Sequence, residues 1–169
     1  MLRTAWLCVL AVILAATPAA AGEPLRILVY GATGSVGSLV VDEALSRGHE
    51  VTAVSRDPST IDARRAGLTA AKGDLLDRDS IAALLPGHDV VVSSVRGVIG
   101  DKSDPENALQ LLAANNIVAE LREFDGVAPR FLHIGGAGSL EVKPGKLFAE
   151  TLPKIALPKS LESEIIGQI

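Results

Sequence analysis

Three glycines recur at intervals of three, directly after an apolar stretch: Gly31, Gly34 and Gly37. The first would allow a tight turn off a strand, the second would let the backbone approach a pyrophosphate, and the third would let a helix pack against the strand. The backbone N–H groups of residues 34–36 would be unpaired donors at a helix N-terminus, where the helix dipole favours an anion. The turn therefore predicts a dinucleotide site, and its expected contacts are Gly31, Thr33, Gly34, Ser35, Val36 and Gly37.

Arg56 follows the second apolar stretch, where the adenosine ribose of a dinucleotide would lie. An arginine there pairs with the 2′-phosphate of NADP, whereas a carboxylate would accept the two ribose hydroxyls of NAD. NADP is therefore the favoured cofactor, and Asp57 keeps NAD open as the alternative. Arg64 and Arg65 could add positive charge to this site, or they could form a solvated surface pair.

Further polar residues follow the later apolar stretches. Ser93 and Ser94 end the fourth one, and we expect one of them to contact the nicotinamide-ribose side, since ligands bind outside the carboxyl ends of parallel strands. His133 lies on the fifth stretch near the same edge and is a candidate proton donor, because histidine titrates near neutrality. His49 and His88 precede strands, and we expect them to be solvated.

The motif over residues 31–37, followed in order by residues 54–58, 72–75, 89–93 and 131–140, resembles the atypical short-chain dehydrogenase/reductase group of NAD(P)H-binding, NAD-dependent epimerase/dehydratase-like proteins. The resemblance covers residues 25–145. It implies that Asp74, with its neighbour Leu75, lies near the adenine; a turn aspartate is the alternative for Asp74. It also implies that Ser139 polarises a substrate carbonyl, although a serine in a flexible loop explains that residue equally well.

The group's usual acid is a tyrosine four residues before a lysine, whose charge lowers the pKa of the phenol. The chain has one tyrosine, Tyr30, which lies inside the first predicted strand. No such pair exists here, so the resemblance carries no mechanism with it. The resembled proteins also continue for about another 50 residues, with a sixth strand and a segment that closes over the substrate, so the chain resembles a C-terminally shortened member of the group.

Apolar stretches alternate with helical stretches along the chain, and the candidate site residues follow the apolar ones. This alternation is typical of βαβ units with a parallel sheet. Right-handed crossovers predict a Rossmann-like, doubly wound α/β fold with strand order 3-2-1-4-5. The resemblance implies that the sixth strand of the group is missing. Asp104 is the expected N-cap of the longest helix, with Pro105 at its first position. The expected strands are residues 25–30, 50–55, 68–72, 90–94 and 130–134. One helix is expected directly after the glycine turn, and two more at residues 79–85 and 105–124. Residues 58–65 would form a short helical or irregular crossover.

The first 21 residues have the pattern of a secretory signal peptide: a positive start, an apolar run of about a dozen residues and a small-residue cleavage site. We expect a secreted or periplasmic protein with no stable membrane span after cleavage, or a cytoplasmic one if the N-terminus is misassigned. Residues 22–145 would form the dinucleotide-binding domain and residues 146–169 a shortened C-terminal segment. The lone Cys8 lies in the signal stretch, which excludes cysteine catalysis and a zinc site in the mature chain; we predict no metal site.

These observations favour an NADP-dependent oxidoreductase that acts on a small organic substrate. A dinucleotide-binding or redox-sensing protein without turnover is one alternative, and a nucleotide-sugar epimerase or dehydratase is another. A truncated relative with little activity is the third. The net charge of −4 and the lack of a basic patch argue against nucleic acid as a partner.

Overall fold

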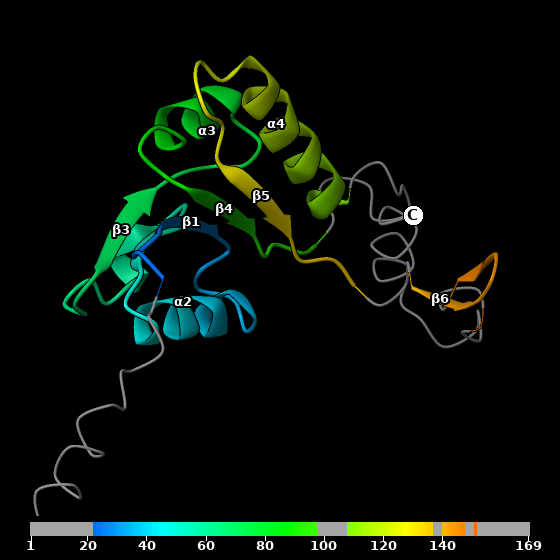
Figure 1. The fold of residues 1–169 in the computed structure, drawn as a ribbon, viewed down its shortest axis with the longest axis horizontal. Coiled ribbons are helices and arrows are strands. Elements are labelled where there is room, and N and C mark those ends of the chain that lie inside the picture. The colour runs from blue at the N-terminus through cyan, green and yellow to red at the C-terminus, as the bar shows by residue number, and fades with distance from the viewer. Residues whose placement is uncertain (1–21, 98–107, 137–139, 148–150, 152–169) are drawn as a thin grey trace, which may run out of the picture.

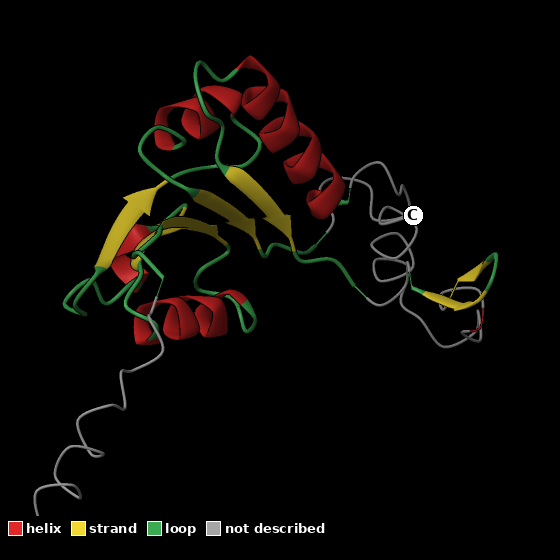
Figure 2. Ribbon diagram, in the orientation of Figure 1, coloured by secondary structure: helices red, strands yellow, loops and turns green. Residues whose placement is uncertain are grey.

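The protein folds around a five-stranded parallel sheet with helices on both faces (Figure 1). The computed structural model describes residues 22–97, 108–136, 140–147 and 151. Helices α3 and α4 lie on one face of the sheet and α2 lies on the other (Figure 2). The elements of the sheet and its helices are β1 (Arg26–Tyr30), α2 (Gly37–Ser46), β2 (Glu50–Ser55), the 3₁₀ turn η1 (Pro58–Thr60), β3 (Leu68–Lys72), α3 (Arg78–Leu84), β4 (Val90–Ser93), α4 (Leu109–Glu123) and β5 (Arg130–His133).

The strand order is β3-β2-β1-β4-β5, which confirms the predicted Rossmann-like topology. Strands β2 and β3 have the predicted bounds, and the other three differ from the prediction by one residue at one end. The longest helix does not run unbroken from Pro105, as predicted, because Ala108 has an extended backbone with φ −63° and ψ 120°. The proposed cap at Asp104 lies outside the described residues.

The core has two layers, because successive residues of a strand point to opposite faces of the sheet. Ile27 and Val29 of β1 pack on the α2 side with Val41 and Ala44. Leu28 and Tyr30 face the other side and pack in a cluster whose helical members include Ile81, Ala113 and Ile117. The central strands are therefore apolar on both faces, as expected for a parallel sheet that is covered on both sides.

The register aligns the carboxyl ends of the strands along one edge of the sheet. Tyr30 at the end of β1 lies between Val54 of β2 and Ser93 of β4, and Ser93 in turn pairs with His133 of β5. The loops that follow these strands therefore meet at one edge of the sheet, where most of the predicted site residues were expected.

A separate two-stranded antiparallel sheet follows β5, consisting of β6 (Glu141–Lys143) and β7 (Lys146–Leu147). Gly145 in its turn has φ +73° and follows Pro144, which fits a type II turn. This hairpin was not predicted from the sequence. No helix in the described part of the chain is long and apolar enough to span a membrane.

Candidate functional site

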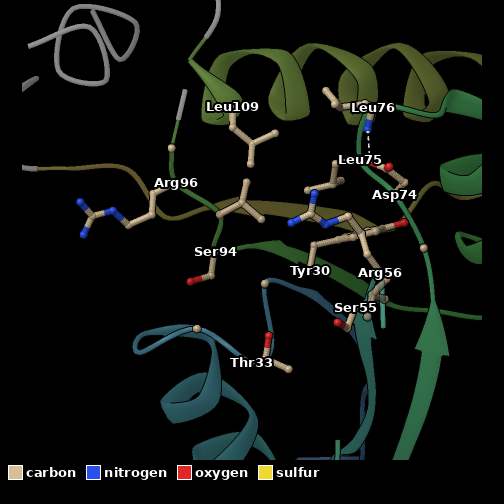
Figure 3. A pocket seen from close by; sticks show the side chains of 16 residues that line it. Tyr30, Thr33, Ser55, Arg56, Asp74, Leu75, Leu76, Ser94, Arg96 and Leu109 are labelled. Carbon is tan, nitrogen blue, oxygen red and sulfur yellow. Dashed lines mark hydrogen bonds between the residues drawn. The ribbon is translucent and has the colours of Figure 1, made fainter. Parts of the chain in front are cut away.

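A cleft of about 490 Å³ lies at the carboxyl ends of β1 to β4 (Figure 3). Its walls come from the turn after β1 and from the loops after β2, β3 and β4, and Leu109 at the start of α4 closes one side. The chain leaves β1 toward β2 on one side and the later strand β4 lies on the other, so the cleft sits where the strand order reverses, the usual ligand site of open α/β sheets. Its volume falls in the range of about 300–1,000 Å³ that is common for small-molecule sites.

At two positions of the turn after β1, contact with other parts of the backbone requires glycine. Gly31 has φ +77°, and a Cβ there would collide with the backbone carbonyl of Ser94. A Cβ on Gly37 would collide with the carbonyl of Gly31, so the first turn of α2 can approach the end of β1 only without a side chain.

Gly34 differs from both, because a Cβ there would approach only the Gly31 carbonyl oxygen, at 3.2 Å. Gly34 also lines the cleft. The absence of a side chain therefore leaves room on the cleft side of the turn, which is where a pyrophosphate would need close access to the backbone. This part of the site fits a dinucleotide.

The N-terminus of α2 faces this turn, and Val36, its N-cap residue, provides no side-chain hydrogen bond to the helix. The prediction that all three N–H groups of residues 34–36 are unpaired is wrong at Gly34, whose N–H donates to the Gly31 carbonyl at 2.9 Å because the turn closes on itself. The N–H groups of Ser35 and Val36 find no acceptor in the described part of the chain. These two donors at a helix N-terminus suit an anion.

Arg56 lines the cleft at the end of β2, with its side chain exposed to solvent. Figure 3 shows its guanidinium above Tyr30 on the cleft side. The carboxylate of Asp57, by contrast, accepts hydrogen bonds from the N–H of Ser59 at 3.1 Å and from its hydroxyl at 2.7 Å. These bonds hold the pKa of Asp57 below its ordinary value and turn its side chain to η1 as a cap.

The other arginines considered for this site pair with nearby carboxylates. Arg64 Nε lies 2.8 Å from Asp62 Oδ1, and Arg65 Nη1 lies 2.7 Å from Asp42 Oδ1. Neither arginine lines the cleft. Both arginines therefore form surface ion pairs, which is the alternative that the sequence left open for them.

Asp74 and Leu75 both line the cleft after β3. Asp74 Oδ1 accepts from the N–H of Leu76 at 2.9 Å, so the residue does form a turn, while its Oδ2 has no partner among the described residues. The Asn116 side chain of α4 donates to the Leu75 carbonyl at 2.8 Å and ties α4 to this loop. Asn116 was not predicted from the sequence, because nothing local marks a contact that spans 41 positions.

The two serines at the end of β4 lie in different environments. Ser93 is fully buried on the α4 side of the sheet, and its Oγ has no hydrogen-bond partner in the described structure. Ser94 lines the cleft, and its N–H donates to the Tyr30 carbonyl at 3.0 Å, which fixes it beside the glycine turn. Ser94 is thus the serine that a bound ligand can reach. Several other lining residues were not predicted as site residues, among them Val95, Arg96 and Leu109.

The candidate catalytic residues are not brought together by the described structure. His133 ends β5 with its ring 6.2 Å from that of Phe131, and it does not line the cleft. Desolvation by neighbouring groups lowers the pKa of His133 below its ordinary value of 6.5, although the residue is exposed at the end of β5, and this favours the neutral ring at pH 7. Ser139 lies outside the described residues. Tyr30 is buried, and burial raises the pKa of its phenol, so it is a poor acid at neutral pH.

A metal site has no support in this geometry. Within the described ranges, no group of three histidine, cysteine, aspartate or glutamate side chains is placed to hold a metal ion. The cleft is instead lined by backbone, hydroxyl and apolar groups with two arginines and one aspartate. Such a lining suits an organic anion.

Several relatives are named as reductases or as homologues of reductases. The chain is 30% identical over 112 residues to pinoresinol reductase 2 from Arabidopsis thaliana, covering 61% of this chain and 35% of the relative. It is 35% identical over 100 residues to isoflavone reductase homolog IRL from Zea mays, covering 53% of this chain and 32% of the relative. The chain thus spans about a third of the length of these two relatives.

Solved structures share the fold. A protein named "Putative exported protein" from Burkholderia pseudomallei is 35% identical with a TM-score of 0.64, and the match covers 85% of this chain and 62% of that one. A "putative epimerase" from Bacteroides thetaiotaomicron is 28% identical with a TM-score of 0.68, covering 86% and 62%. A family model described as NAD(P)H-binding matches residues 31–165, from the glycine turn to well beyond β5. The chain therefore belongs to the NAD(P)H-binding family, and the cofactor that suits its cleft is a nicotinamide dinucleotide.

Proposed function

We propose that the protein is an NADP-dependent oxidoreductase that acts on a small organic substrate. The proposed preference for NADP rests on the contrast between two neighbouring side chains at the end of β2. Arg56 lines the cleft, whereas the Asp57 carboxylate that could select NAD is held by Ser59. A guanidinium in this place suits a 2′-phosphate and leaves the ribose of NAD without its usual acceptor.

Each part of the cleft has a role in this proposal. The N–H groups of Ser35 and Val36 would bind the pyrophosphate, and Arg56 would bind the 2′-phosphate. Apolar side chains after β3 and β4 would cover the faces of the adenine, and Asp74 Oδ2 would accept from its amino group. A bound dinucleotide would supply the hydride chemistry, and the protein would orient it. The reductases among its relatives support a redox reaction.

A calorimetric titration of the full chain with NADPH and with NADH tests the proposal. We expect NADPH to bind more tightly, and we expect Arg56→Gln to remove most of that difference, a loss of about tenfold or more for a charge-assisted pair. Arg64→Gln is the matched control, since Arg64 is an arginine on the same crossover that pairs with Asp62 away from the cleft. Equal affinity for both cofactors in the wild type would refute the NADP preference, and no binding to a folded protein would refute the proposal.

A second candidate is a dinucleotide-binding or redox-sensing protein without turnover. It is favoured by the state of Tyr30, the chain's one tyrosine, which is buried in β1 and unsuited to donate a proton. A panel of carbonyl compounds with NADPH separates the two candidates. Oxidation of NADPH that depends on both the protein and a carbonyl supports the reductase, and tight binding without any oxidation supports the sensor.

We also propose that the protein is exported. Support comes from the signal-like pattern of residues 1–21 and from the similarity to the protein of Burkholderia pseudomallei that is named as exported. Expression of the full chain in a Gram-negative host, followed by fractionation and N-terminal sequencing, tests this. A periplasmic product that starts near residue 22 is the expected result, and an uncleaved cytoplasmic product would contradict it.

A further inference from the structure

We propose that Asn116 of α4 is a positioning residue for the cofactor, because it holds residues 74–76, the β3 loop, in the conformation that binds the adenine. The inference rests on the proposed function, since it needs a dinucleotide in the cleft. It goes beyond that function, because it assigns part of the affinity to a side chain that is not among the described lining residues of the cleft.

The β3 loop forms one wall of the cleft, and its conformation decides which groups a ligand meets there. Asp74, Leu75 and Leu76 all line the cleft, and Figure 3 shows them beside α4. Leu75 is 6% exposed and packs in the core cluster that includes residues of α3 and α4, whereas Leu76 is exposed. A change of the backbone at Leu75 would therefore move both the Asp74 carboxylate and the Leu76 side chain.

Two helices hold the β3 loop through hydrogen bonds to its backbone. On the α3 side, the N–H of Asp74 donates to Ser80 Oγ at 3.0 Å. On the α4 side, Asn116 Nδ2 donates to the Leu75 carbonyl at 2.8 Å. Within the loop, Asp74 Oδ1 accepts from the N–H of Leu76 at 2.9 Å. The Asn116 bond thus connects the middle of the loop to α4.

This hydrogen bond explains why residue 116 is an asparagine. Asparagine is a poor helix former, because its amide competes for backbone hydrogen bonds, and residue 116 lies inside a helix of 15 residues. Ala113 and Ile117, on either side of it along the helix, are fully buried in the apolar cluster. Packing in this place would favour an apolar residue. A partly buried amide is instead suited to donate to the loop.

Ion pairs further along the same helix link α4 to α3. Arg78, the first residue of α3, pairs with Glu120 and Glu123 of α4, and its Nη2 lies 3.1 Å from Glu123 Oε1. Glu120 and Glu123 follow Asn116 by four and seven positions, so the three side chains lie on one face of the helix. The two helices lie side by side (Figure 1). α4 can therefore act as a support for the loop that leads into α3.

Loss of the Asn116 bond should weaken cofactor binding without unfolding the protein. The Leu75 carbonyl would lose this donor, and the β3 loop would sample conformations that do not bind the adenine. The apparent Kd rises in inverse proportion to the fraction of molecules in the binding conformation. One hydrogen bond of this kind corresponds to a change of about threefold to tenfold in an equilibrium constant.

Calorimetry on the full chain with Asn116→Asp tests the proposal, with NADP⁺ and adenosine 2′,5′-bisphosphate as probes. Aspartate has nearly the size of asparagine, but at pH 8 its carboxylate presents an acceptor to the Leu75 carbonyl in place of a donor. We expect both probes to bind about threefold to tenfold more weakly, and by the same factor, since the second probe carries the adenosine end without the nicotinamide. Asn115→Asp is the matched control, because it makes the same chemical change at a neighbouring exposed asparagine, and it should keep the wild-type affinity.

Lower pH should restore the affinity of Asn116→Asp, because a protonated carboxyl can again donate to the Leu75 carbonyl. Partial burial beside a carbonyl oxygen raises the pKa of a carboxyl and favours this form. We expect the ratio of the variant's Kd to the wild-type Kd to fall toward unity between pH 8 and pH 6, whereas the ratio for Asn115→Asp stays constant. The charged groups of Asp74 on the loop, Arg78 on α3 and Glu120 on α4 are common to all three proteins, so the ratio isolates residue 116.

Three results would overturn the inference while the proposed function stands: wild-type affinity for NADP⁺ in Asn116→Asp, a loss for NADP⁺ that adenosine 2′,5′-bisphosphate does not share, or weaker binding that persists unchanged at pH 6, which would assign the loss to packing. If circular dichroism shows that Asn116→Asp does not fold, the uncharged pair Asn116→Ala and Asn115→Ala makes the same comparison at pH 8. Failure of the wild type to bind either probe refutes the proposed function itself, and the role of Asn116 falls with it.

Discussion

Replacing Tyr30 by phenylalanine should stabilise the protein or leave its stability unchanged. The side chain is 2% exposed at the end of β1, and its hydroxyl has no hydrogen-bond partner among the described residues. A buried polar group without a partner costs about 1–3 kcal/mol of desolvation, and phenylalanine removes the hydroxyl while it keeps the ring. We expect the free energy of unfolding to rise by about 1 kcal/mol.

Urea unfolding followed by circular dichroism measures this change, since a shift in the midpoint at constant m reports stability alone. Tyr30 lines the cleft but its hydroxyl is buried, so the affinity for NADPH should not change. Phenylalanine that lowers the free energy of unfolding by more than about 1 kcal/mol would refute the reasoning, because it would mean that the hydroxyl makes a hydrogen bond that stabilises the fold.

The same burial makes a prediction at high pH. Burial raises the pKa of Tyr30 above its ordinary value of 10.0, so the folded state holds the proton after the unfolded state has lost it. The stability that this group contributes is complete below pH 10.0 and is lost as the pH rises from there toward the raised pKa. Since the chain has one tyrosine, the absorbance of phenolate reports this site directly. Titration in the folded protein near pH 10.0 would contradict the burial of the phenol.

Two glycines of the turn after β1 give opposite predictions. Gly34→Asp should abolish dinucleotide binding in calorimetry, because its charge repels a pyrophosphate, while thermal unfolding changes less than in a variant of Gly31 or Gly37, because a Cβ at Gly34 meets one protein atom, at 3.2 Å. Unchanged NADPH affinity in that variant would place the pyrophosphate elsewhere. Gly37→Ala should instead lower the thermal midpoint clearly, because its Cβ collides with the Gly31 carbonyl and forces α2 away from β1. A variant with the wild-type midpoint would show that α2 can move at no cost.

The sheet could be predicted because its order follows from a few local patterns and one rule of handedness. Short apolar runs separated by helical stretches indicate parallel strands, and right-handed crossovers then leave few arrangements. The bounds of β2 and β3 were predictable because a glycine or a charged turn ends each run. The start of α4 was not, because proline at residue 105 predicts a first helical turn there, whereas Ala108 remains extended.

The cleft was less predictable, because its details depend on which face each residue takes. Two adjacent serines end β4, and the pleat sends Ser93 into the core and leaves Ser94 at the cleft. Sequence alone could not choose between them without the exact phase of the strand. Likewise, Asp57 could have faced the ribose site, and a local hydrogen bond to Ser59 decided otherwise. Leu109 reaches the cleft only through the packing of α4 on the sheet.

The glycine turn shows how the requirements of the fold can be separated from those of the ligand. Gly31 and Gly37 face protein atoms that a side chain would displace, so any protein with this strand-to-helix geometry would need glycine at both positions, whether or not it binds a cofactor. Gly34 lines the cleft, and a Cβ there would meet one protein atom within 4 Å, the Gly31 carbonyl oxygen at 3.2 Å, which is a tight contact but not a collision. A pyrophosphate in contact with the backbone would be a second reason for the absence of a side chain. The middle glycine is therefore the position in this turn whose identity argues for a bound dinucleotide, and its substitution tests function with the least disturbance to the fold.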